Sequence, residues 1–293
     1  MSTLQDNEIK ALIELLDDND PEVFDHVTNK LLELGPAVIE KLEDAYTYAS
    51  GPVMVERIED IIHKIQFDLV EKDLEYWAAH GSDDLLKGIL IVTRHQYPDL
   101  DEEDIIKIIT RIRKDIWIGL NNYLTPLEQI NVFNQVIFSQ YQFLGLQNND
   151  DELRYSYFNN LLDSNKGNHF TIGLLYLILC QQLELSVYGV RLHTHFILAR
   201  TKDFITDFTD NEELRADILF YINPYNKGLV FSDREIDLYI RKLDIEPRPE
   251  FYLPSSNKAV VKEYIQYLSK LYSKPEDQYK VDDLARLDSL LEE

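Results

Sequence analysis

Asn168 and His169 stand directly before an apolar run that extends to residue 183, and they open the part of the sequence whose residue types could do chemistry. Two further histidines, His193 and His195, follow the run. Imidazole acts as a base, a hydrogen-bond partner or a metal ligand near neutral pH. We therefore predict a polar site at the start of the run. Its candidate ligand-binding residues are Asn168, His169, His193, His195 and Asn223.

The two asparagines also have a structural interpretation. Asparagine at a helix start commonly caps the helix, and asparagine before proline commonly belongs to a turn. Asn168 precedes the predicted helix, and Asn223 precedes Pro224. We therefore expect capping and turn roles for these residues beside, or in place of, contacts with the amide or carboxylate of a ligand.

A metal site is a second interpretation of the histidines. His193 and His195 are two residues apart, which would place both on one face of a strand, and His169 at the helix start would face them. No acidic residue stands near them at ligand spacing. The sequence therefore predicts no metal and no cofactor.

Cys180 is the only cysteine of the sequence, and it lies inside the apolar run. A thiol in such a helix behaves as a small buried hydrophobic group, and burial raises its pKa. We predict a structural role for Cys180 rather than that of a displaced nucleophile. A single cysteine also excludes a disulfide within this sequence and any zinc site made of cysteines, and it fits a reducing compartment.

The elements that must position these residues form an α+β core. Residues 168–183 are predicted to be one buried helix. Short β-branched runs follow, and packing the helix against one face of a small antiparallel sheet would bury both. The predicted strands are residues 187–192, 194–201, 204–208, 218–222 and 229–231.

Helices flank this core on both sides in the sequence. Those before it are predicted at residues 74–79, 85–97, 102–121, 126–141 and 152–162. Thr125 and Glu128 form a capping box at the start of the fourth of these, and Ser232 and Glu235 form another before a helix that ends near residue 242. Two last helices, at residues 258–272 and 281–291, form a C-terminal helical hairpin.

The N-terminal residues contain a weak helical repeat. Residues 20–34 align with residues 51–65, with Pro21 on Pro52 and Leu31 on Ile62. Proline in the first turn and apolar residues three or four apart start a helix and bury one stripe. With a further helix at residues 37–48, the pattern is similar to HEAT-type repeats. We expect it to pack on the rest of the protein or to present a groove to a partner.

Several strings, taken in order, resemble the SirB-type branch of the transglutaminase-like superfamily. They are residues 85–100, 155–167, 183–185, 188–190, 195–196 and 222–226. The resemblance implies a predominantly helical α+β fold whose core is transglutaminase-like, or cysteine-protease-like. The implied parts are a HEAT-like helical region at residues 1–80, the core with a helical lead-in at 81–245, and a tetratricopeptide-like helix pair at 246–293.

Active members of this superfamily carry a cysteine at the start of the central helix, a histidine on the following strand and an aspartate on the next. The resemblance places these three positions at His169, His195 and Asn223. The nucleophile is therefore missing, and the resemblance implies that its absence is common in the SirB-type branch. These residues are the positions of a vestigial triad.

We therefore predict a non-catalytic protein, a binding, scaffold or regulatory module for a protein or peptide. The alternative is a hydrolase or acyltransferase in which His195, oriented by Asn223, acts as base for water or a substrate group. A lone general base contributes only about 10²–10⁴-fold, which is far less than acyl transfer needs.

The charge balance disfavours other classes of partner. The sequence has 53 acidic and 29 basic residues, and its net charge of −24 repels phosphate backbones and anionic lipid surfaces. It has no signal-like N-terminal segment, and its longest apolar run is far shorter than the roughly 20 residues of a membrane span. We predict neither nucleic acid nor a membrane as partner, and a cytoplasmic location.

Overall fold

The structure is a computed structural model of the 293-residue chain, and it describes residues 3–18, 20–49, 51–146 and 152–291. The chain forms two compact units, Met1–Asp73 and Leu74–Glu293. Helices dominate the described residues, and strands of the second unit form a small antiparallel sheet. The predicted class, predominantly helical α+β, is confirmed. Among the described residues, no helix combines the length and apolar character that crossing a membrane requires.

Amphipathic helices build the first unit. They are α1 (Thr3–Glu14), α2 (Pro21–Leu34), α3 (Ile39–Tyr48) and the first part of α4 (Pro52–His80). Asp20 caps α2 by accepting the N–H of Glu22 at 2.9 Å. The apolar stripes meet in one core, in which Leu31, Leu42 and Ile58 are fully buried.

Residues 74–79 are helical as predicted, but they form the end of α4, which is 29 residues long, and not a separate helix. Neither glycine nor proline interrupts the chain from Val53 to His80. Buried apolar residues also recur at helical spacing towards its end, as at Leu74 and Trp77. Nothing in the sequence therefore ends the helix before Gly81.

The second unit continues with α5 (Leu85–Arg94), α6 (Glu102–Gly119) and α7 (Pro126–Asn134). Asp84 and Asp101 cap the first two of these helices. Thr125 and Glu128 form the predicted capping box of α7. The helix predicted to continue to residue 141 instead changes to a π-helical turn over Gln135–Gln140. There the N–H of Tyr141 donates to the carbonyl oxygen of Val136, five residues back.

The helix predicted at residues 152–162 is only partly present. A 3₁₀ turn at Leu153–Tyr155 comes first, and α8 (Phe158–Ser164) starts after it. The Ser156 hydroxyl donates to the carbonyl oxygen of Glu152, and Tyr157 has an extended backbone. Tyr157 is only 1% exposed, and its hydroxyl bonds that of Tyr272 at 2.7 Å. Burial of this side chain in the interior therefore decides where the helix breaks.

The central helix, α9 (His169–Gln182), is confirmed, and its residues from 169 to 180 are all buried. The sheet consists of β3 (Val187–Leu192), β4 (His195–Thr201), β5 (Ile218–Asn223) and β6 (Leu229–Phe231). Its strands are antiparallel and lie in the order β3-β4-β5-β6. A separate parallel pair, β1 (Leu144–Gly145) with β2 (Lys166–Gly167), precedes α9.

The strand predicted at residues 204–208 is wrong, since these residues form a loop before α10 (Asn211–Asp217). Phe204 is 62% exposed, so it is not an inward residue of a strand. Asp207 accepts from the N–H of Thr209, and Asp210 caps α10 through the N–H groups of Glu212 and Glu213. Hydrogen bonds between a side chain and a backbone N–H two or three residues later favour turns over strands.

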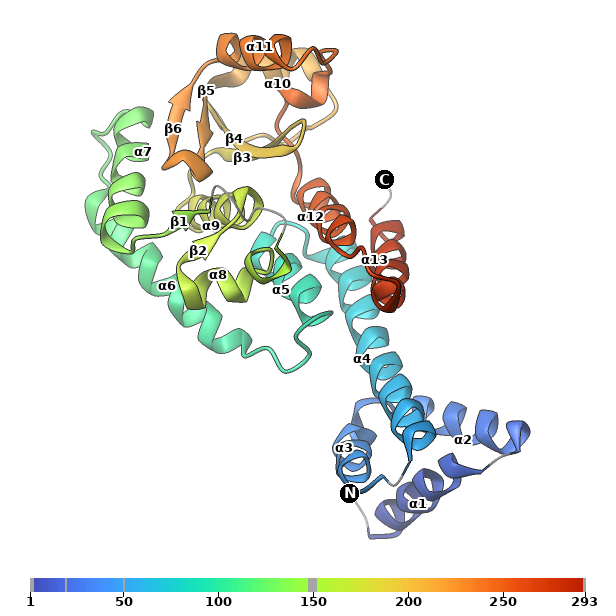
Figure 1. Cartoon of the computed structure of the whole chain (residues 1–293). Coiled ribbons are helices and arrows are strands. Elements are labelled where there is room, and N and C mark those ends of the chain that lie inside the picture. Colours follow the sequence, from blue (N-terminus) through green and yellow to red (C-terminus); the bar gives the residue numbers. More distant parts are fainter. Residues whose placement is uncertain (1–2, 19, 50, 147–151, 292–293) are drawn as a thin grey trace. The chain divides into compact units, whose positions relative to one another are not determined.

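The two faces of the sheet are covered by different helices, as Figure 1 shows with α9 on one side and α11 (Asp233–Lys242) on the other. On the α9 side, Phe196 stacks on Phe170 with ring centroids 4.5 Å apart. On the α11 side, Ile236 and Ile240 pack in one cluster with Ile197. Neighbouring residues of β4 thus pack on opposite faces of the sheet, because successive side chains of a strand point to opposite sides.

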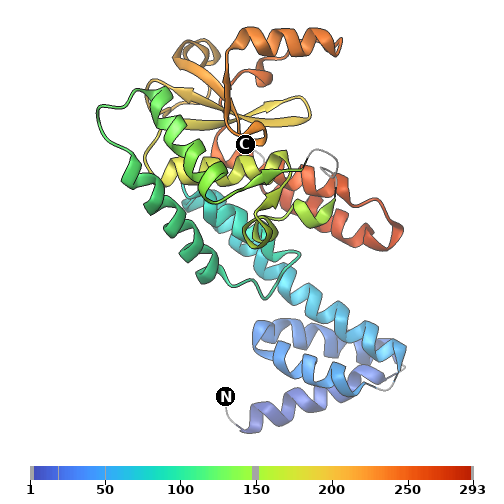
Figure 2. The same cartoon turned by 60° about the vertical axis from the view of Figure 1, so that its left-hand side comes forward.

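The C-terminal helical hairpin is present as α12 (Asn257–Leu271) and α13 (Gln278–Ser289), which lie side by side in Figures 1 and 2. The segment before α12 is bonded to the sheet, because the N–H of Ser255 donates to the carbonyl oxygen of Gly189 at 2.8 Å. A Cβ on Gly189 would lie 2.9 Å from Val260. The edge strand β3 and α12 are therefore in close contact.

Candidate functional site

A pocket of about 490 Å³ lies at the N-terminus of α9, and we call it the α9 pocket. Its walls come from the start of α9, from the β3–β4 hairpin and from α12. The polar side chains that matter for its chemistry are His169, Arg191, His193, Glu263, Tyr267 and Lys270.

Asn168 is the buried cap of α9. Its side-chain oxygen accepts the N–H groups of Phe170 and Thr171, both at 3.0 Å. Its amide nitrogen donates to the hydroxyl of Ser156 at 2.9 Å and to that of Tyr267 at 2.7 Å. Asn168 therefore satisfies the helix start and positions Tyr267 at the pocket wall.

His169 is 8% exposed and occupies the first position of α9. Its Nδ1 accepts the N–H of Phe196 at 3.2 Å, which assigns the ring proton to Nε2. Burial, with a smaller effect of nearby His195, lowers the pKa of His169 from 6.5 to about 4. At neutral pH the imidazole is therefore uncharged, and its Nδ1 is bonded to the backbone.

His195 begins β4, and it is half-buried. Its ring lies edge-on to His169, with centroids 5.6 Å apart, and edge-on to Tyr239 at 5.8 Å. Asn223 ends β5, and its side-chain oxygen accepts the N–H of Asn226 at 3.1 Å. The structure therefore brings two of the three candidate triad positions together, and the oxygen of the third caps its own turn.

His193 is not on a strand. It forms, with Thr194, the two-residue turn between β3 and β4, where its φ is 53°. The prediction that His193 and His195 share a strand face is therefore wrong, because the chain reverses between them. Within the part of the chain that the structure describes, no three His, Cys, Asp or Glu side chains are grouped to hold a metal ion.

Glu263, on α12, lines the pocket, although it is not among the predicted site residues. Its side chain is 16% exposed, and its closest cation is Arg191, with Nε 3.7 Å from the carboxylate. Burial raises the pKa of Glu263 to about 7, opposed by the charges of Arg191 and Lys270. The spacing of Glu263, Tyr267 and Lys270 along one face of a helix could have indicated them.

Cys180 is completely buried, as predicted for a structural thiol. Burial raises its pKa far above the ordinary range. It lies in the interior of α9, whereas the α9 pocket is lined by the first two residues of that helix. Cys180 is therefore not available to a ligand in the α9 pocket.

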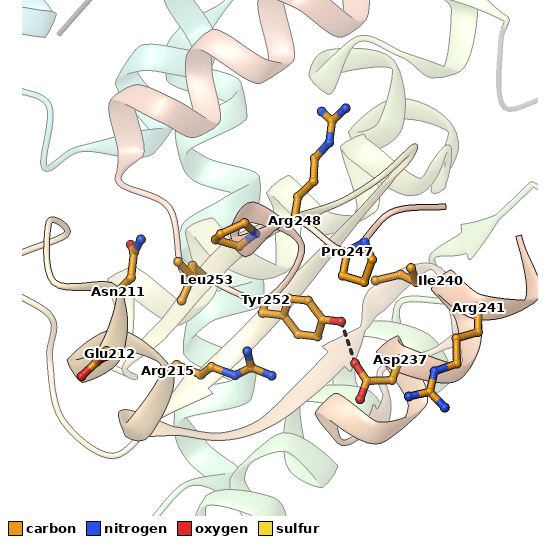
Figure 3. A pocket seen from close by; sticks show the side chains of 11 residues that line it. Asn211, Glu212, Arg215, Asp237, Ile240, Arg241, Pro247, Arg248, Tyr252 and Leu253 are labelled. Carbon is orange, nitrogen blue, oxygen red and sulfur yellow. Dashed lines mark hydrogen bonds between the residues drawn. The ribbon is translucent and has the colours of Figure 1, made fainter. Parts of the chain in front are cut away.

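A second pocket, of about 540 Å³, lies between α10, α11 and residues 247–253, and we call it the α11 pocket. Figure 3 shows the Tyr252 hydroxyl directed at Asp237, to which it donates at 2.6 Å. The Arg215 guanidinium lies over the Tyr252 ring, 4.6 Å from its centroid. Arg248 extends away from this pair, and it lies 3.6 Å from the carboxylate of Glu250.

A family model described as the transglutaminase-like superfamily matches residues 103–266. The match covers more than half of the chain, and it includes α9, the sheet and Glu263. The chain therefore belongs to this superfamily. The curated proteins contain no match to it, and the solved structures contain none either.

Proposed function

We propose that this protein is a non-catalytic member of the transglutaminase-like superfamily that binds a peptide segment of a partner protein in the α9 pocket. The observation that carries the proposal is the state of His169. A neutral imidazole, bonded to the backbone of Phe196, stands where the resemblance expects the cysteine, and it lines an open polar pocket.

Acyl transfer needs a nucleophile activated by a base. Within the described residues the only thiol, Cys180, is buried. The low pKa of His169 makes it a weak base at neutral pH. The alternative enzyme would rely on His195 with Asn223 as the orienting group, but the side-chain oxygen of Asn223 accepts a bond within its own turn. The geometry therefore supports binding better than catalysis.

The dimensions and lining of the α9 pocket suit a short peptide. Its volume of about 490 Å³ lies within the range of ordinary ligand sites. Charged groups such as Arg191 and Glu263 stand beside Phe170 and Leu271, so the pocket offers both polar and apolar contacts. The net charge of −24 also opposes a nucleic-acid partner.

The finer assignments are part of the same proposal. We assign the chain to the SirB-type branch, the helices of residues 1–80 to a HEAT-like region, and α12 with α13 to a tetratricopeptide-like pair. The proposed location is the cytoplasm. Helical repeats commonly present surfaces to partner proteins, which supports a scaffold or regulatory role.

A displayed-peptide selection tests the proposal. Peptides fused at their C-termini to the display protein are selected on the wild type and counter-selected on Ser273→Trp, which fills the rim of the α9 pocket. Thr110→Trp, at an exposed position of α6, is the matched control. Peptides that bind the wild type and the control but not Ser273→Trp are expected. Equal recovery on all three proteins, together with no calorimetric binding of a peptide that has a free C-terminus, would contradict the proposal.

The catalytic alternative is tested on the same preparations. Amine incorporation into a glutamine-containing peptide, and release of ammonia from it, are measured for the wild type and for His195→Gln. We expect no turnover above the uncatalysed rate in either. A wild-type activity that His195→Gln removes would establish the hydrolase or acyltransferase instead.

A further inference from the structure

The α9 pocket is locally cationic in a strongly acidic chain. Arg191 and Lys270 enter it from β3 and α12, and Glu263 is the acidic residue among its lining side chains. The chain as a whole carries −24. A cationic pocket in such a chain is an electrostatic well for a negative group.

Two backbone N–H groups of the helix start are already occupied. The Asn168 side chain already accepts the N–H groups of Phe170 and Thr171. With these two N–H groups occupied, the charged side chains of β3 and α12 are the main candidates to hold a negative ligand.

The surroundings of the Glu263 carboxyl are a second feature that points to a ligand. Its carboxyl is 16% exposed, and the Nε of Arg191 at 3.7 Å is beyond hydrogen-bond distance. Within the described residues the carboxyl accepts no hydrogen bond, although it lines a pocket. A mostly buried carboxyl group without such a partner is normally satisfied by water or by a ligand.

We propose that the α9 pocket binds a carboxylate group of its peptide through Arg191 and Lys270, and that Glu263 takes up a proton when the ligand binds. This inference rests on the proposed peptide-binding function. The protonated Glu263 carboxyl would donate a hydrogen bond to the incoming carboxylate, whereas the ionised form would repel it and compete for Arg191.

The surroundings of Glu263 support this exchange. Arg191 and Lys270 favour its ionised form, and Glu250 disfavours it. His169 and His193 line the same pocket. Because the pKa of Glu263 is about 7 without ligand, the carboxyl can change its ionisation near neutral pH at small cost. Affinity for a carboxylate should therefore fall as the pH rises above about 7.

Calorimetry with three probe peptides tests the ligand chemistry. The probes are N-acetyl-trialanine with a free C-terminal carboxylate, its C-terminal amide, and the amide of N-acetyl-Ala-Glu-Ala. At about pH 6 we expect a carboxylate-bearing probe to bind the wild type at least roughly tenfold more tightly than the neutral amide. The first probe binding better identifies a peptide C-terminus, and the third identifies an acidic side chain.

Point variants test the groups. For the better probe, wild-type affinity is expected to fall roughly tenfold from about pH 6 to about pH 8.5, and Glu263→Gln to remove that fall. Arg191→Gln should weaken binding at least roughly tenfold at both pH values. His193→Gln should keep the fall, which separates the effect of Glu263 from that of this neighbouring histidine. Lys107→Gln, at an exposed position of α6, should match the wild type. Circular dichroism confirms that each variant is folded.

Three results would overturn the inference. One is equal binding of the neutral amide, another is an unchanged pH dependence in Glu263→Gln, and the third is no binding of either carboxylate probe up to about 10 mM. The displayed peptides have no free C-terminus, and their selection reports binding in the α9 pocket whatever the charge of the peptide. Their selection can therefore succeed while this inference fails, so the two failures are distinguishable.

Discussion

The α9 pocket and the α11 pocket are nearly equal in volume, about 490 and 540 Å³, but they differ in how their polar groups are satisfied. In the α11 pocket the Tyr252 hydroxyl donates to Asp237, and the same ring supports the Arg215 guanidinium. In the α9 pocket the Glu263 carboxyl has only a long contact with Arg191. Volume therefore does not distinguish the two sites, whereas the satisfaction of polar groups does.

The two pockets also differ in how they respond to pH. Burial, together with the bond to Asp237, raises the pKa of Tyr252 to about 12, so this hydroxyl stays protonated near neutrality. Burial raises the pKa of Glu263 to about 7, so this carboxyl changes charge there. The same physical cause thus produces a fixed donor in one pocket and a titrating group in the other.

The largest expected effect is the slow chemical modification of Cys180 in the folded protein, which tests whether either pocket reaches the interior. Cys180 is completely buried, so iodoacetamide should modify the native protein at least roughly a thousandfold more slowly than the protein in guanidinium chloride. Mass spectrometry of quenched samples measures both rates. Rapid modification of the native protein would mean that a pocket opens into the core around α9, and the comparison of two separate surface pockets would fail.

A matched pair of cap removals compares the helix starts that flank the two pockets. Asn168→Ala removes the acceptor of two backbone N–H groups at the start of α9. It also removes the amide that donates to the hydroxyls of Ser156 and Tyr267. We expect the free energy of unfolding to fall by about 2–4 kcal/mol.

Asp210→Ala is the control for that change. It removes a cap of the same kind from α10, but at an exposed position. A loss of about 0.5–1 kcal/mol is expected. Urea unfolding measures both variants, and equal losses would show that the buried network of Asn168 adds nothing to the cap.

The ionisation of Glu263 should appear in the pH dependence of stability. Its folded pKa of about 7 is above its ordinary value of 4.5, so the folded state binds this proton more tightly than the unfolded state does. The stabilisation is fully present below about pH 4.5 and is lost as the pH rises through about 7. Relative to Glu263→Gln, the wild-type free energy of unfolding should fall by roughly 2–3 kcal/mol over that interval. A constant difference between the two proteins would contradict the raised pKa.

Among the residues that line the two pockets, the smallest expected effect comes from Tyr252→Phe in the α11 pocket. Losing the bond of 2.6 Å to Asp237 should lower the free energy of unfolding by about 1 kcal/mol. Because the pKa of Tyr252 is about 12, that loss should not vary between about pH 6 and about pH 8. A loss that changed across this interval would remove the contrast between the pockets.

Local signals predicted several helix starts and strands correctly. The capping boxes at Thr125 and Ser232 are present where their spacing places them. β3 and β6 have the predicted bounds, and Asn168 caps the predicted central helix. Each of these features depends on residues a few positions apart, so the sequence carries the complete signal.

The failures lie where distant residues decide. The chain breaks at Ser156 and Tyr157 because the Tyr157 side chain is buried and bonds Tyr272, more than a hundred residues later. Phe204 remains exposed in a loop, although the sequence pattern of residues 204–208 predicts a strand. Periodicity cannot report either outcome, because burial depends on which elements pack together.

The sequence by itself determined the superfamily, the α+β core, the buried thiol and the histidine at the start of α9. Only the tertiary structure decided the chemistry of the α9 pocket, because packing α12 against β3 brings Glu263 beside Arg191, 72 positions earlier in the chain. That packing removes most of the water from the Glu263 carboxyl and raises its pKa. Desolvation is a property of the folded surroundings, and residue types and spacing do not contain it.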